Sequence, residues 1–395
     1  MPGIRILHCA DFHFEAAFSG LVPSLAGQRR EDLRTTFLNL VRWNAGTSEA
    51  TEILLIAGDL FDGRRIGPAT QDCILKGFAS NPQTLVFIAP GNHDPIELRS
   101  LYRRLVFPDH VFVFGLSPAP AGTPVLRGRG ILGPAQGPIR SVFLPEFKTC
   151  VYGGAFEGPY ADEPFPGPSF RVLDPNCTNL MVLHADIDGI RLPGAYNPVS
   201  SASLWQSGID YLALGHRHSH DGFKHAGETL YAYSGVPEGH GFDEPGTCGF
   251  IAGSVWKGGQ DLAFVPAGLG RYERVSLDIT GLGNHEDLYR RITEAVPASP
   301  WVFYQVVLRG LIAPGFQIIP DLVAEKACRD YSHLQVIDDT VTRPDPSGPA
   351  GSLRNLFIRE LLDRIAAADG EEQKEILETA LKAGLEAFGQ RGGRG

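Results

Sequence analysis

Aspartate, asparagine and histidine side chains recur directly after short apolar segments in the amino-terminal part of the chain. A mixture of carboxylates and imidazoles suits Mn²⁺, Fe²⁺ or Zn²⁺. Segments such as Glu52–Ala57 and Thr84–Ala89 read as buried strands, and polar residues follow each of them. Sites in α/β sheets form at the carboxyl ends of strands, so these polar residues are candidate metal ligands. They stand in five motifs along the chain: Asp11-Phe12-His13, Gly58–Asp62, Gly91–Asp94, His184 and Gly215–His218.

The spacing within two of these motifs places pairs of side chains on one side of the chain. Alternate residues of an extended segment point the same way, so Asp11 and His13 can face one pocket, and so can His216 and His218. Asp59 has two carboxylate oxygens and can bridge two metals. Two metals about 3.5–4 Å apart can activate a water and hold a phosphodiester in line for attack. The predicted chemistry is therefore hydrolysis of a phosphoester.

Each motif taken alone also has an ordinary structural explanation. Gly-Asp and Gly-Asn pairs are common turn sequences. A single histidine at a strand end is more often a structural residue than a ligand. Five such motifs in order, each after an apolar strand, favour the metal site.

The overall composition limits the class of protein. The chain has 395 residues, enough for two or three domains, and its net charge is −10. No global basic field attracts nucleic acid, which argues against a simple DNA-coating protein but not against an enzyme with bound cations. The six cysteines form no CxxC pair, and neither a signal peptide nor a membrane-spanning apolar run is recognised. We therefore expect a cytoplasmic protein with reduced thiols and no membrane contact.

The pattern of secondary-structure signals changes twice along the chain. Over residues 1–270, alternating strand and helix signals and then short β-like runs predict two mixed sheets packed face to face with helices outside. Residues 271–345 read as a small βαβαβ domain. Residues 346–395 contain the end of a Pro/Asp/Gly-rich linker, two helices with apolar stripes and an RGGRG tail. The stripes serve either packing on the parent domain or docking of a partner.

The motif set DxH, GDxxD, GNHD, a lone histidine and GHxH resembles the signature of the calcineurin-like metallophosphoesterase superfamily, and every element is matched here. The resemblance implies an α/β fold, a four-layer α/β/β/α sandwich with two metals at the strand ends. It implies that the first metal is held by Asp11, His13, Asp59 and His218, and the second by Asp59, Asn92, His184 and His216. His93 would act as a general acid or as a donor to the transition state, with Asp94 orienting it.

Three segments also resemble the SbcD and YhaO branch of that superfamily: GDLFD at 58–62, LHADID at 183–188 and YAYSGVPEGHGFDEPGTCGF at 231–250. This resemblance implies a DNA-repair exonuclease subunit that uses two divalent ions, Mn²⁺ before Fe²⁺ or Zn²⁺. Residues 271–345 then resemble a small α+β DNA-capping domain, and the terminal helices resemble the dock for an SbcC-like coiled-coil ATPase. DNA and such an ATPase are the implied partners, and a homodimer is a further option.

Other functions and other residues stay open on the sequence alone. The same site would serve a small-molecule phosphodiesterase or phosphatase, although the C-terminal segments favour a larger substrate, and the intact ligand set disfavours a non-catalytic scaffold. Five arginines follow the second and third motifs and either contact a phosphate backbone or form a solvated surface: Arg64, Arg65, Arg99, Arg103 and Arg104. Three histidines near the last motif are not expected to be ligands: His220, His225 and His240.

Overall fold

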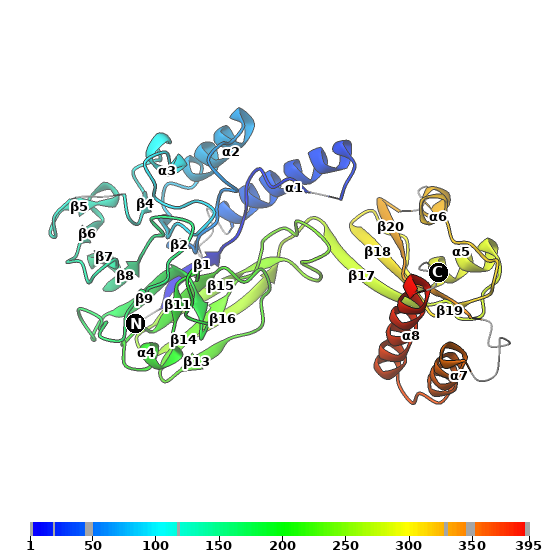
Figure 1. Ribbon diagram of the computed structural model, residues 1–395. Helices are drawn as coiled ribbons and strands as arrows, with labels where there is room; N and C mark the ends of the chain where they lie inside the picture. Colours follow the sequence, from blue (N-terminus) through cyan, green and yellow to red (C-terminus); the bar gives the residue numbers. More distant parts are fainter. Residues whose placement is uncertain are drawn as a thin grey trace. The chain divides into compact units, whose positions relative to one another are not determined.

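The computed structural model describes residues 3–18, 20–43, 50–116, 119–327, 331–344 and 352–391. The chain divides into two compact units, Met1–Arg271 and Tyr272–Gly395, and each is described by itself (Figure 1). Most of the predicted linker, the last residues of the predicted tail and Cys328 lie outside the described residues.

A six-stranded sheet with parallel central strands carries half of the first unit. Its order is β16 (Gly259–Pro266), β15 (Gly249–Trp256), β1 (Ile4–Cys9), β2 (Ile53–Ile56), β3 (Leu85–Ile88) and β4 (Val111–Val113). Every residue of β2 and β3 is buried, as expected for parallel strands covered on both faces. β1 pairs with parallel β2 on one side and with antiparallel β15 on the other.

An eight-stranded mixed sheet lies against the first. Its order is β13 (Lys224–Ala226), β14 (Thr229–Tyr233), β12 (Tyr211–Gly215), β9 (Thr178–His184), β8 (Thr149–Gly153), β7 (Arg140–Leu144), β6 (Gly130–Leu132) and β5 (Pro124–Val125). Strands β8, β9, β12 and β14 are parallel to one another. A short additional pair joins β10 (Asp186–Ile187) to β11 (Pro198–Val199).

Three apolar layers hold the first unit together. Side chains alternate along β1, so that Leu7 packs toward helices α1 (Pro23–Val41) and α2 (Pro68–Ala79), whereas Ile6 packs toward the second sheet. The short helix α3 (Leu101–Arg104) adds to the first layer. The outer face of the second sheet packs against α4 (Ser201–Trp205). This arrangement confirms the predicted four-layer sandwich (Figure 1).

Helix α1 extends further toward the amino terminus than its apolar spacing predicts. That spacing indicates a helix from Glu31 to Trp43, whereas α1 begins at Pro23. Proline at the first helical position needs no N–H partner. Arg29, in the added stretch, is buried and pairs with the carboxylate of Glu238. An ion pair therefore holds the first turns of α1 in place, and a pattern of apolar residues cannot reveal an ion pair.

The second unit carries small sheets with helices packed on them. A three-stranded sheet has the order β17 (Arg271–Asp278), β18 (Val302–Arg309) and β20 (His333–Asp338), and β19 (Leu311–Ile312) pairs with β21 (Val341–Thr342). Helices α5 (His285–Ala295) and α6 (Pro320–Ala327) join its core through Leu288, Ile292 and Val323. Asn284 caps α5 by accepting a hydrogen bond from the N–H of Asp287, three residues further along the chain.

The terminal helices α7 (Leu353–Ala366) and α8 (Glu371–Arg391) share a small core with the second unit. Its buried members are Leu311, Val341, Leu361, Ile365 and Leu381. By contrast, Leu353 is 72% exposed, and Leu356 and Ile376 are also exposed. The apolar side chains therefore serve packing in part and remain at the surface in part. None of the described helices is long and apolar enough to cross a membrane.

Candidate metal centre

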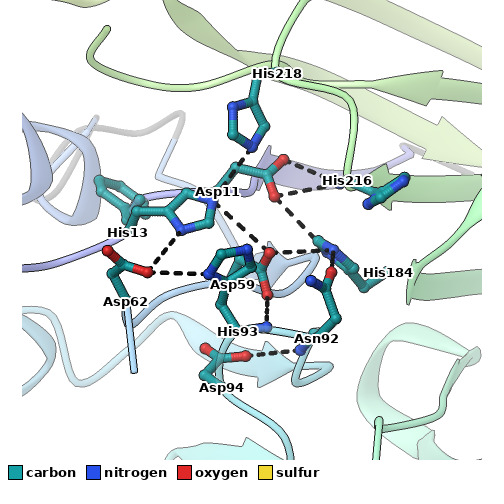
Figure 2. A network of polar contacts seen from close by, with 12 residues as sticks. Asp11, His13, Asp59, Asp62, Asn92, His93, Asp94, His184, His216 and His218 are labelled. Atoms are coloured by element: carbon teal, nitrogen blue, oxygen red, sulfur yellow. Dashed lines mark hydrogen bonds and ion pairs between the residues drawn. The ribbon is translucent and has the colours of Figure 1, made fainter. Parts of the chain in front are cut away.

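The five motifs converge where parallel strands of both sheets end (Figure 2). The strand β1 leads to Asp11 and His13, β2 to Asp59, β3 to Asn92 and His93, β9 to His184, and β12 to His216 and His218. His184 closes β9 and lies opposite Gly215 of the neighbouring parallel strand, so the last two motifs start from adjacent positions. The ends of these strands thus bring the residues of the five motifs together in space.

The backbone of the ligand loops departs from the extended conformation. The φ angle is 54° at Asp11, 45° at His13, 48° at Asp59 and 103° at His216. Such conformations cost a residue other than glycine about 1–3 kcal/mol and persist where the surroundings impose them. Here the N–H of Asp11 donates to the carbonyl of Gly58 at 3.0 Å, and that of His13 donates to the carbonyl of Asp59 at 2.9 Å. Asp11 and His13 converge through left-handed backbone and not through alternation along an extended segment.

The ring of His184 presents a nitrogen to two oxygen ligands. Its Nδ1 lies 2.9 Å from the carbonyl oxygen of Ala57, which can only accept, so Nδ1 carries the proton. Its Nε2 lies 2.9 Å from Oδ1 of Asn92 and 3.3 Å from Oδ2 of Asp59. Because both of these oxygens accept, Nε2 also carries a proton when no metal is bound, in agreement with the raised pKa of His184, about 9. A bound cation would take the place of that proton. These three residues fit a metal ion by the chemistry of their donors.

A second group of donors surrounds Asp11. Nε2 of His13 lies 3.2 Å from Nε2 of His218 and 3.7 Å from Oδ2 of Asp59. One donor atom each of Asp11, His13 and His218 lie within 4.8 Å of one another, and the same holds for Asp11, Asp59 and His184. Two facing imidazole nitrogens beside carboxylates again fit a cation. Asp59 contacts residues of both groups, as a bridging ligand would.

Burial and charge strongly perturb the pKa values of these groups. Burial raises the pKa of Asp11 to about 7, although His184 and His218 oppose the change. Burial lowers the pKa of His13 to about 3 against the attraction of Asp59. For His184 burial acts downward, but Asp59 and Asp11 raise the pKa to about 9. The buried carboxylate of Asp11 thus lacks enough positive charge from the neighbouring imidazoles to stay ionised easily. A bound metal ion would supply that positive charge.

His216 occupies a different place from the other candidate ligands. Its N–H lies 3.1 and 3.2 Å from the two carboxylate oxygens of Asp11, and Figure 2 shows its ring turned away from that carboxylate. The ring lies 5.3 Å from that of His184 and 4.9 Å from that of Tyr196, centroid to centroid. His216 belongs to none of the compact donor groups among the described residues. Its role as a ligand stays a prediction.

The predicted pairing of Asp94 with His93 is wrong in this structure. The carboxylate of Asp94 is buried and accepts from the N–H of Gly91 at 2.7 Å, the N–H of Phe61 at 3.1 Å and the hydroxyl of Tyr102 at 2.6 Å. It braces the loop from inside, because adjacent residues of a turn point in different directions. Nδ1 of His93 instead lies 3.0 Å from Oδ1 of Asp62 (Figure 2). This contact raises the pKa of His93.

Two further residues, His240 and Glu244, lie at the site although they belong to none of the five motifs. His240 lies with its ring 5.5 Å from that of His13, and the carboxylate of Glu244 contacts both His218 and His240. His240 is not in a compact donor group of the described residues, and the expectation that it is not a ligand stays a prediction. Both residues fall within segment 231–250, whose resemblance to the SbcD and YhaO branch was the available signal.

A cavity of about 240 Å³ opens beside Asn92 and His93 and is also lined by Arg64 and Glu97. Arg64 pairs with Glu97 at 2.6 Å and, through its carbonyl, accepts from the guanidinium of Arg104 at 3.2 Å. The arginines singled out from the sequence are all exposed: Arg64, Arg65, Arg99, Arg103 and Arg104. Of these arginines, Arg64 lines the cavity, and its charge is paired there with Glu97.

Known proteins resemble this chain in sequence. Residues 4–220 match the sequence profile of the calcineurin-like phosphoesterases. YhaO of Bacillus subtilis strain 168, described as an uncharacterized metallophosphoesterase, is 22% identical over 299 residues, which cover 74% of this chain and 68% of that protein. The SbcD component of the nuclease SbcCD of Rhodobacter capsulatus is 30% identical over 146 residues, which cover 36% of this chain and 34% of that protein. Because the profile covers more than half of the chain, this protein belongs to the calcineurin-like phosphoesterase family, hydrolases with a site for two metals.

Proposed function

We propose that this chain is a metal-dependent DNA nuclease that hydrolyses phosphodiester bonds as a subunit of an SbcCD-like repair complex in the cytoplasm. One observation supports the proposal most directly. The carboxylates and histidines of the site are mostly buried, and the loops that follow the candidate ligands Asp59 and Asn92 carry exposed arginines. The similarity to a component of the nuclease SbcCD supports the same conclusion.

The donor set divides into two proposed metal positions that share Asp59. We assign the first position to Asp11, His13, Asp59 and His218, and the second to Asp59, Asn92, His184 and His216. When bound, two divalent ions, with Mn²⁺ proposed first, supply Lewis-acid chemistry that activates water and offsets charge on the phosphoryl group. The protein's part is to fix the ligands, and the hydrogen bonds from His184 to the carbonyl of Ala57 and from the N–H of His93 to Asp59 do so.

His93 is the proposed proton donor to the leaving oxygen or to the transition state. It adjoins the ligand Asn92, yet its own ring lies against Asp62 and is about half exposed toward the cavity. Asp62 orients the ring and favours its protonated form, which a general acid requires. In this proposal Asp62 orients the ring of His93, the role that was expected of Asp94 because it is next to His93 in the sequence.

The exposed arginines are the proposed contacts for the phosphate backbone of DNA. Arg65 and Arg99 lie on the loops that follow Asp59 and Asn92, and both side chains are exposed. Guanidinium groups bind phosphate oxygens without reading base sequence. A cationic track of this kind offsets, locally, the overall negative charge of the chain.

A small-molecule phosphodiesterase is the alternative, and the net charge of −10 together with the modest cavity favours it. The two functions differ in the size of the substrate on either side of the phosphodiester bond that is cleaved. A nuclease should act on single-stranded DNA and duplex ends with Mn²⁺ and lose binding steeply as salt rises. A small-substrate enzyme should turn over a chromogenic phosphodiester far better than DNA, with little effect of salt.

The arginine double variant R65Q/R99Q separates these two functions more sharply. For a nuclease it should weaken DNA binding and lower the slope of log affinity against log salt by roughly 1 per lost phosphate contact, while hydrolysis of the chromogenic diester is unchanged. R127Q, which removes an exposed arginine elsewhere in the first unit, is the matched control. DNA hydrolysis that is absent in the wild type, or equal in both variants, would refute the DNA track.

A further inference from the structure

A single carboxylate, that of Glu244, is shared between two histidine rings at the edge of the site. Its side chain is only 8% exposed. One oxygen contacts Nδ1 of His218. The other lies 2.8 Å from the backbone nitrogen of His240 and 3.0 Å from Nδ1 of the same ring. Glu244 lies in the connection between β14 and β15 and thus on a different segment from the metal-ligand motifs.

His240 carries this connection across to the first motif. Its Nε2 donates to the carbonyl oxygen of Phe12 at 3.0 Å, directly between Asp11 and His13 in the chain. Its ring also lies 5.5 Å from that of His13 and 5.6 Å from that of Phe18, centroid to centroid. Glu244 and His240 therefore connect the loop of His13 with the loop of His218, although these ligands are far apart in sequence.

The contact with Glu244 fixes which nitrogen of His218 is available to a metal. A carboxylate can only accept, so Nδ1 of His218 carries a proton, and Nε2 is the ring nitrogen left to face a metal. That Nε2 faces Nε2 of His13 at 3.2 Å. At the second metal position a backbone group does the equivalent work, because Nδ1 of His184 donates to the carbonyl of Ala57. The two positions thus depend on different supporting groups.

We propose that Glu244 is a positioning residue that builds one metal position selectively, the position formed by Asp11, His13, Asp59 and His218. The inference rests on the two-metal arrangement proposed above and is independent of the substrate. Carboxylates that hold a ligating histidine set its tautomer and its orientation, and their loss typically lowers metal affinity about 10–100-fold.

Mn²⁺ titration of metal-free protein, followed by calorimetry and by electron paramagnetic resonance, tests this role without measuring activity. The wild type should bind two ions. E244A should bind one ion with unchanged affinity and the other about 10–100-fold more weakly. E244Q keeps an oxygen for His218 but sets an amide group against His240, so its loss should be smaller and confined to the same ion. D243N, an exposed neighbour on the same segment, is the control and should match the wild type.

The outcomes separate this inference from the function proposed above. A wild type that binds a single ion refutes the two-metal arrangement and the role of Glu244 with it. A wild type that binds two ions, with E244A weakening both equally or neither, refutes only the role of Glu244. If E244A does not fold, E244Q decides, because it preserves shape and must still weaken one ion alone. DNA hydrolysis can fail in the wild type without changing any of these results.

Discussion

The buried pair of Arg29 and Glu238 allows the packing of the first unit to be tested quantitatively. The two side chains are 1% and 0% exposed. Besides the guanidinium, Glu238 accepts from the hydroxyl of Thr36 at 2.7 Å and from the N–H groups of Leu269 and Gly270 at 2.8 and 2.9 Å. One carboxylate thus joins α1, the segment after β14 and the end of the unit.

The substitution R29M leaves this carboxylate its neutral donors but removes its counter-charge. Removing one partner of a buried ion pair costs about 3–5 kcal/mol, because a charge stays buried and uncompensated. In a domain of this size each kcal/mol lowers the melting temperature by about 2–4 °C. We therefore expect the melting temperature of the first unit to fall by about 6–20 °C. Scanning calorimetry of the metal-free protein measures the change.

A surface pair supplies the matched control. The side chains of Lys76 and Asp72 are 74% and 57% exposed, so K76M should cost about 0–1 kcal/mol. Adding E238Q to R29M removes the stranded charge, so the double variant should be less destabilised than the sum of the two single variants. A loss in R29M no larger than that in K76M, or strictly additive effects in the double variant, would refute the account of a charge-anchored α1.

The remaining predictions concern catalysis, pH and partner binding. The variant H93Q should retain both metals and bind DNA normally but lose about 10²–10⁴-fold in turnover, as measured by single-turnover kinetics with metal analysis; loss of a metal would contradict its assignment. Burial lowers the pKa of His8 from 6.5 to about 3, so below pH 6.5 only the unfolded chain takes up this proton, and the free energy of unfolding should fall by about 1.4 kcal/mol per pH unit down to about pH 3. The free energy of unfolding, measured by chemical denaturation at several pH values between 3 and 6.5, should therefore fall less steeply with decreasing pH for H8Q than for H225Q. H225Q is the control, because it removes an exposed histidine of the same unit. The double variant L353D/L356D should keep the melting temperature of the second unit and abolish association with an SbcC-like ATPase in a pull-down, whereas retained association would place the dock elsewhere.

The sequence predicted the parts of the site that depend on strand ends. Apolar runs such as EILLIA and TLVFIA became buried parallel strands, and the sheet then fixed where Asp59 and Asn92 had to lie. Parallel strands end on the same edge whatever the loops between them do. For this reason the sequence alone predicts that motifs from distant parts of the chain converge.

Contacts made by side chains within the loops could not be inferred in the same way. Adjacency in sequence paired Asp94 with His93, but the turn sends Asp94 inward to Tyr102 and leaves Asp62 beside the ring. Likewise, no periodicity links Glu244 to His218 or anchors the start of α1 at Arg29. These contacts depend on the path of turns and on long-range packing, which local patterns do not encode.

The place of β1 in its sheet has a consequence for biosynthesis. This strand lies near the start of the sequence and pairs with β2 on one side, but its other edge pairs with β15, at residues 249–256. While the chain is being made, the first strands can assemble early and present an open edge, which invites pairing with other chains. The donor group of Asp11 and His218 cannot close until the second sheet has been synthesised as well. We therefore expect metal uptake to follow, and to mark, completion of the nascent first unit.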